Sequence, residues 1–186
     1  AIMLPVAVLP VAAIMMGIGY AMCPATMQGG DVTGIIQIIG FALVKIGSAV
    51  IDKLPMLFAV GVAIGLSKDQ HGAAGLAGLV AFLTVTTVLN SGVVATMMGA
   101  EEAPLAFSKI DNAFIGIISG ITASVCYNKF SSAQLPTALA FFSGKRCVPI
   151  VTSFVMVAES AILYFVWPML FNALVWVGEH IMGLGP

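Results

Sequence analysis

The chain has 186 residues, of which 60% are hydrophobic and only 8% are charged, and its formal net charge is −1. Soluble domains carry roughly 25% charged residues, so this composition excludes a water-soluble globular domain, and the near-zero charge argues against a nucleic-acid partner. A mean hydropathy of +1.11 instead indicates an all-α integral membrane protein whose solvent is the lipid bilayer.

Three apolar segments open the chain. Ile2–Met22 contains no charged residue and is long enough to span a bilayer. Asp31–Lys53 is amphipathic, which predicts an interfacial helix or one whose polar stripe faces protein or water. The stripe consists of Gln37, Lys45, Ser48 and Asp52. Leu54–Leu66 is too short to span alone, so we expect it to share the crossing of the helix before it.

Two further spans are predicted in the middle of the chain. Gly72–Asn90 begins after the sharp polar turn Ser67–His71, and Asn112–Phe130 follows a polar loop at Ser91–Asp111. Each span is apolar and rich in small residues, which allow neighbouring helix backbones to approach closely.

The last predicted span is Val148–Trp167. Pro168 should break it, because proline removes a backbone donor, and Met169–Met182 should continue as a separate apolar helix. The chain is therefore predicted to cross the bilayer about five times, with amphipathic or interfacial helices between the spans.

The basic residues predict an orientation. Lys68, Lys129, Lys145 and Arg146 would lie on one side of the membrane and three lysines on the other, and the side with more basic residues faces the cytoplasm. This places the N-terminal end inside and the C-terminal end outside. Because the first residue is Ala1 and no basic leader precedes the first helix, we expect a retained span that lacks the true N-terminus.

No catalytic or metal-binding constellation is predicted. The cysteines Cys23, Cys126 and Cys147 are far apart, and His71 and His180 lie in or near polar turns. None has a companion at metal-ligand spacing. We therefore expect packing cysteines, solvated histidines, no metal and no other cofactor.

Glu159 is the one carboxylate well inside a predicted span. An acid at this depth is a candidate for a proton relay or a substrate contact. The alternative is a protonated or hydrogen-bonded glutamate between packed helices, because no cation is predicted at the same depth.

The segment Gln134–Ile150 is the candidate functional site, and we expect a cytoplasmic re-entrant or interfacial segment. Candidates for a substrate gate or for docking a partner domain are Phe141, Phe142, Gly144, Lys145 and Arg146. Two interpretations remain open. The two cations could anchor the following span at the membrane surface, or they could bind anionic groups of a phosphosugar or a phosphorylated partner beside an aromatic platform.

Four blocks of the chain carry a family resemblance. They are Met3–Gly17 (MLPVAVLPVAAIMMG), Leu54–Leu66 (LPMLFAVGVAIGL), Ile115–Phe130 (IGIISGITASVCYNKF) and Leu135–Thr152 (LPTALAFFSGKRCVPIVT). In this order they resemble the glucose-family membrane component, EIIC, of the bacterial phosphoenolpyruvate-dependent sugar phosphotransferase system. Cys147, where the family usually has Phe, and Glu159, where it is usually apolar, depart from the pattern.

The resemblance implies a homodimeric permease of the bacterial cytoplasmic (inner) membrane. Such a protein moves a hexose inward while a phosphorylated IIB domain phosphorylates the sugar. Its partners are the IIB and IIA phosphotransferase domains. Residues 1–186 would be the N-terminal half, a dimerisation scaffold, and the sugar-binding second half with its Gly-Ile-Thr-Glu motif would be absent. The phosphoryl-transfer residues would lie elsewhere too, so Cys147 is not expected to be the phosphocysteine, and whether this chain counts as an enzyme stays open.

The identity of the sugar rests on two short segments. Ser67–Gly78 resembles the N-acetylglucosamine branch, whereas LPTALAFF resembles maltose and glucose members. We expect N-acetylglucosamine first and glucose second. The alternative is a non-transporting scaffold or dimerisation fragment of such a transporter.

Overall fold

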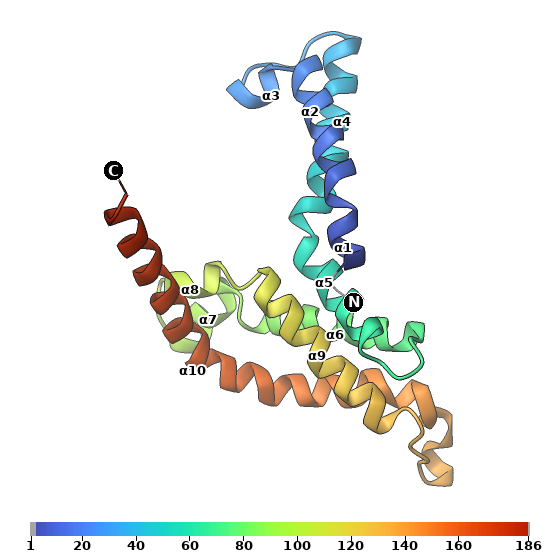
Figure 1. The fold of residues 1–186 in the computed structure, drawn as a ribbon. Helices are drawn as coiled ribbons and strands as arrows, with labels where there is room; N and C mark the ends of the chain where they lie inside the picture. Colours follow the sequence, from blue (N-terminus) through green and yellow to red (C-terminus); the bar gives the residue numbers. More distant parts are fainter. Residues whose placement is uncertain (1–2, 186) are drawn as a thin grey trace.

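A computed structural model describes residues 3–185, and these residues form helices and no strand. The elements in chain order are α1 (Met3–Ala7), α2 (Leu9–Met22), α3 (Ala25–Gln28), α4 (Ile35–Asp52), α5 (Leu54–Gly65), α6 (Gly72–Val88), α7 (Ser91–Met98), α8 (Leu105–Ser108), α9 (Ala113–Phe130), the 3-10 helices η1 (Thr137–Phe142) and η2 (Gly144–Arg146), and α10 (Cys147–Gly183). Figure 1 shows an elongated hairpin of α2 and α4 standing on a bundle of the later helices.

The predicted all-α membrane architecture is confirmed. Four helical stretches among the described residues are long and apolar enough to cross a membrane, beginning at Met3, Ile35, Ala113 and Gly144. Helices α6 and α7 form a fifth when counted together, although they are bent by 50° at the break between them. Helix α5 has only 12 residues and follows α4 directly, whereas α4 is long enough to span by itself, so a crossing shared by the two helices stays a prediction.

The α2–α4 hairpin depends on glycine. A Cβ atom on Gly19 would lie 2.6 Å from the Gly40 carbonyl oxygen, and one on Gly47 would lie 2.6 Å from the Ala12 carbonyl oxygen. Both distances are shorter than van der Waals contact, so only glycine permits this backbone approach. The outer faces of the two helices remain apolar and exposed.

Helix α9 packs against α5 and α6 in the same way. A Cβ atom on Gly120 or on Gly78 would lie 2.7 Å from the Ala59 carbonyl oxygen. The two glycines therefore let α9 and α6 approach the same point of α5. The small residues that the sequence shows in the span Gly72–Asn90 thus allow α6 to approach α5 closely.

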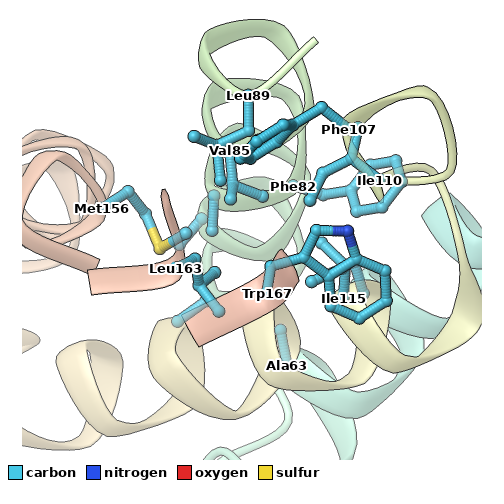
Figure 2. Close-up of a cluster of buried hydrophobic side chains, with 14 of the residues drawn as sticks. Ala63, Phe82, Val85, Leu89, Phe107, Ile110, Ile115, Met156, Leu163 and Trp167 are labelled. Atoms are coloured by element: carbon cyan, nitrogen blue, oxygen red, sulfur yellow. The ribbon is translucent and has the colours of Figure 1, made fainter. Parts of the chain in front are cut away.

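The buried core lies where α5, α6, α8, α9 and α10 meet. Figure 2 shows its apolar side chains converging from these helices: Ala63, Phe82, Val85, Leu89, Phe107, Ile110, Ile115, Met156, Leu163 and Trp167. The Trp167 indole N–H donates a hydrogen bond of 2.7 Å to the Ala106 carbonyl oxygen, and the Phe107 ring stacks on Tyr164 at 5.7 Å. Helix α10 is thereby fastened to α8.

The prediction of a structureless loop at Ser91–Asp111 was wrong, because α7 and α8 lie within it. The Asn90 side chain accepts a hydrogen bond from the Gly92 N–H at 3.0 Å and caps α7, as asparagine does at helix starts. Gly99, at φ +65°, ends α7 in the left-handed conformation. Buried Phe107 then holds α8 against α10.

The predicted break at Pro168 was also wrong. Pro168 lies inside α10, which runs from Cys147 to Gly183 without an interruption, although Figure 1 shows a bend between its orange first part and its dark red last part. A proline costs one backbone hydrogen bond, and neighbouring helices can compensate for that loss in a membrane protein. Here Trp167, just before the proline, stacks on Phe114 of α9 at 6.2 Å and contacts Phe171 at 6.1 Å, so packing holds both sides of the proline.

Candidate functional site

The segment of residues 134–146 leaves the helical bundle as a compact loop, which we call the cationic loop. Pro136 precedes η1, and Gly144, at φ +72°, turns the chain into η2. The Gly144 N–H donates to the Ala133 carbonyl oxygen at 2.8 Å, and the Leu135 N–H donates to Ser143 Oγ at 3.0 Å. These bonds close the loop on itself, and they explain why glycine, which tolerates positive φ, stands at position 144.

An aromatic pair and an arginine form the outer face of the loop. The Phe141 ring is 69% exposed and meets the Phe142 ring edge-on at 5.3 Å. The Arg146 guanidinium lies 4.7 Å from the centre of the Phe141 ring, and its Nη1 donates to the Phe141 carbonyl oxygen at 3.3 Å. The structure therefore brings Phe141, Phe142 and Arg146 together, and it leaves Arg146 with further N–H donors that have no partner among the described residues.

Lys145 points elsewhere. Its Nζ lies 3.1 Å from Asp69 Oδ2, with both side chains about half exposed. Asp69 belongs to the turn between α5 and α6, which the sequence places on the same side of the membrane as the cationic loop. That relative placement is confirmed, but Asp69 itself was missed, because only the fold brings it next to Lys145.

The turn that carries Asp69 is fastened to the end of α9. The Asn128 side chain accepts a hydrogen bond from the Lys68 N–H at 2.7 Å and donates one to the Leu66 carbonyl oxygen at 3.0 Å. Gln70 adopts φ +52°, a conformation that non-glycine residues seldom adopt. The Asn128 side chain thus binds the backbone on both sides of the turn and determines where Asp69 lies.

The electrostatic surroundings of Asp69 favour its charged form. The Tyr127 hydroxyl is buried and faces the Asp69–Lys145 pair, although it makes no hydrogen bond of standard geometry among the described residues. Its proximity, followed by that of the Lys145 ammonium group, lowers the pKa of the Asp69 carboxyl below the ordinary value of 3.8. Asp69 is therefore an anion throughout the neutral range. Its carboxylate balances the positive charge of its partner Lys145.

Glu159 lies apart from the cationic loop. It is 12 residues beyond Cys147 along α10, which corresponds to about 18 Å at 1.5 Å per residue. The Thr122 hydroxyl on α9 donates to Glu159 Oε2 at 2.7 Å, and Oε1 is buried without a partner among the described residues. Glu159 borders a groove of about 570 Å³ between α9 and α10.

The cysteines and histidines form no site. All three cysteines are buried as free thiols, and residues 3–185 contain no group of three His, Cys, Asp or Glu side chains able to hold a metal ion. His71 is exposed, and its Nδ1 accepts a hydrogen bond from the Ala73 N–H at 3.0 Å, which caps α6. Cys147 is packed at the start of α10, beside the cationic loop but shielded from solvent.

Helices long and apolar enough to span a membrane, a hairpin with a largely apolar exposed surface and a charged loop at one end define an all-α membrane protein. Residues 1–186 match the family model described as "Phosphotransferase system, EIIC", and the chain belongs to this family. It is also similar to the PTS system N-acetylglucosamine-specific EIICB component of Bacillus subtilis (strain 168), with 36% identity over 185 residues. The alignment covers 98% of this chain and 34% of that relative, so the chain spans about one third of the relative's length. The family resemblance found in the sequence is confirmed.

Proposed function

We propose that residues 1–186 are the N-terminal half of the membrane permease component of a sugar phosphotransferase system. The permease imports a hexose, N-acetylglucosamine in preference to glucose, while a IIB domain phosphorylates it. The observation that carries this proposal is the family match over the whole chain, and the name of the relative in Bacillus subtilis supports N-acetylglucosamine as the sugar. The sugar site and the phosphoryl-transfer residues belong to other parts of the permease.

Within this permease, the cationic loop is the docking edge for the phosphorylated IIB domain. Three features support this role: the loop stands out from the bundle (Figure 1), its aromatic rings are exposed, and Arg146 has N–H donors to spare. Guanidinium groups bind phosphate in a bidentate geometry with charge-assisted hydrogen bonds. An anchor for the next span would need the positive charge but not this arrangement.

The α2–α4 hairpin contributes to the scaffold of a homodimer in the bacterial cytoplasmic membrane. Most of its exposed side chains are apolar, although α4 also exposes Lys45 and Asp52. The exposed apolar side chains include Val11, Ile14, Ile18, Ile35, Ile36 and Ile39. A surface of this size must be covered by lipid or by protein. In the permease, lipid covers part of it and the second protomer covers the rest.

The test of this function is phosphoryl transfer in membrane vesicles that contain the full-length permease. Phosphorylated IIB domain is added, and phosphorylation of N-acetylglucosamine and of glucose is measured. Arg146→Gln should lower the transfer rate about 10-fold or more, as expected for the loss of a charge-assisted hydrogen bond. Lys109→Gln, which removes a cation from a different loop, is the matched control and should transfer at the normal rate. A permease that transfers no phosphoryl group to either sugar would instead support the non-transporting scaffold.

A further inference from the structure

The cationic loop has one polar connection to a distant part of the chain. Its other hydrogen bonds, from Gly144 to Ala133 and from Leu135 to Ser143, close the loop on itself. Among the described residues, only the ion pair between Lys145 and Asp69 joins the loop to the turn between α5 and α6. Helix η2 also packs against α9 and α10, and the ion pair adds the one polar contact that ties the loop, and with it the exposed aromatic face, to the α5–α6 turn.

The partner of Lys145 is held by a rigid frame. The Asn128 side chain binds the backbone on both sides of the turn, at Leu66 and at Lys68. Asn128 itself belongs to α9, whose neighbouring Tyr127 is almost fully buried. Asp69 is thus positioned by the helical core, whereas Lys145 is positioned by Asp69.

We propose that Asp69 is a positioning residue, which holds Lys145 so that Arg146 and Phe141 present an anion-binding face to the phosphorylated IIB domain. The proposal rests on the docking role of the cationic loop given above. It assigns different tasks to the two adjacent cations. Lys145 is neutralised by Asp69 and fixes the loop, while Arg146 stacks on Phe141 and meets the anionic group of the partner.

The division of tasks follows from the chemistry of the two side chains. A lysine ammonium group is a compact charge on a flexible stem, suited to a single ion pair. The Arg146 guanidinium has five N–H donors, of which one is used at Phe141. Its planar fork suits a phosphoryl group, so the free donors lie on the residue that is able to use them.

An exposed ion pair adds little to stability. If the pair served only stability, its loss would change the fold little and would leave partner binding unchanged. If the pair positions the loop, its loss should raise the Michaelis constant for phosphorylated IIB domain. This difference allows the two possibilities to be separated by kinetics.

The test uses charge exchange in the full-length permease in membrane vesicles. We expect Asp69→Lys and Lys145→Asp each to raise the KM for phosphorylated IIB domain about 3- to 10-fold, as for a mispositioned charge at the rim of an interface, with kcat unchanged. The double exchange Asp69→Lys/Lys145→Asp should bring KM back to within about 2-fold of the original, because the pair re-forms with reversed polarity. Glu101→Lys, in the loop between α7 and α8, is the control and should leave KM unchanged.

Two results would overturn the proposal. The first is that a single exchange leaves the KM for phosphorylated IIB domain at its original value. The second is that the KM of the double exchange is as high as that of the single exchanges. Failure of the docking role has a separate signature, because Arg146→Gln would then leave KM unchanged. In that case a spin-label distance between Ala138→Cys and Val125→Cys still decides whether Asp69 positions the loop: Asp69→Asn broadens the distance distribution if it does and leaves it unchanged if it does not.

Discussion

One oxygen of the Glu159 carboxyl has a hydrogen-bond partner on the neighbouring helix, and the other is buried without a partner among the described residues. The Thr122 hydroxyl satisfies Glu159 Oε2 across the α9–α10 contact, and no cation pairs with this carboxyl among the described residues. The site is distant from the cationic loop. We therefore propose that Glu159 serves helix packing and does not handle sugar.

This assignment predicts the behaviour of two variants. Glu159→Gln should leave sugar affinity unchanged, because the amide oxygen still accepts the Thr122 hydrogen bond. Thr122→Val should destabilise the full-length permease by about 1 kcal/mol, the typical worth of such a bond between membrane helices. Calorimetric titration with N-acetylglucosamine and thermal unfolding in detergent measure the two effects.

The matched control for that prediction is Glu179→Gln, which changes an exposed glutamate on the same helix and should affect neither property. A loss of sugar affinity in Glu159→Gln but not in Glu179→Gln would show that Glu159 contacts the substrate or relays a proton, and would contradict the packing role.

Residues that the sequence singled out were brought together only in part. Phe141, Phe142 and Arg146 are close in the sequence, which is why one short segment could be named as the candidate site. Asp69 could not be paired with Lys145 from the sequence, because that contact depends on α5, α6 and α9 packing together. The only available signal was that Asp69 and Lys145 carry opposite charges and lie in two loops predicted on the same side of the membrane.

At the scale of the helices, small residues determine how closely the elements approach. Gly120 of α9 faces the Ala59 carbonyl oxygen of α5, with room for a hydrogen but not for a methyl group. Gly178, near the end of α10, has nothing within 4 Å of its would-be Cβ atom. The same residue type therefore has a packing role at one position and none at the other.

Alanine substitutions should separate these roles. Gly120→Ala should destabilise the full-length permease by about 1–3 kcal/mol, the usual cost of overpacking a contact. Gly178→Ala should leave stability unchanged or raise it slightly, because alanine is the better helix former. Thermal unfolding of both variants in detergent checks the prediction, and equal stability of the two would show that α9 does not depend on this close approach.

Helix existence was predictable, but helix ends were less so. Long apolar runs produced α2, α4, α9 and the first part of α10, since their length and hydropathy suffice for a span. Helices α7 and α8 are short, and α8 is held by Phe107 against α10 and not by any periodic pattern of its own. Pro168 does not end α10 for a related reason, because the rings that Trp167 contacts hold the helix on both sides of the proline.

For the whole molecule, the central question is how the chain lies in the membrane. The Lys145–Asp69 contact places the cationic loop and the α5–α6 turn at one end. The loop before α4 and the segment between α7 and α8 are separated from this end by predicted spans. Basic residues predict that the end with the cationic loop faces the cytoplasm, where a IIB domain could reach it.

Thiol labelling of the full-length permease in intact cells tests this orientation. We expect Ala138→Cys, in the cationic loop, to be protected from a membrane-impermeant maleimide and to become reactive only after the cells are opened. Thr33→Cys and Glu101→Cys should react without opening the cells. All three positions are exposed and the native cysteines are buried, so the parent protein provides the unlabelled background. Labelling of Ala138→Cys in intact cells would place the cationic loop outside, where no cytoplasmic IIB domain could dock, and the docking role would then have to be abandoned even if the fold is correct.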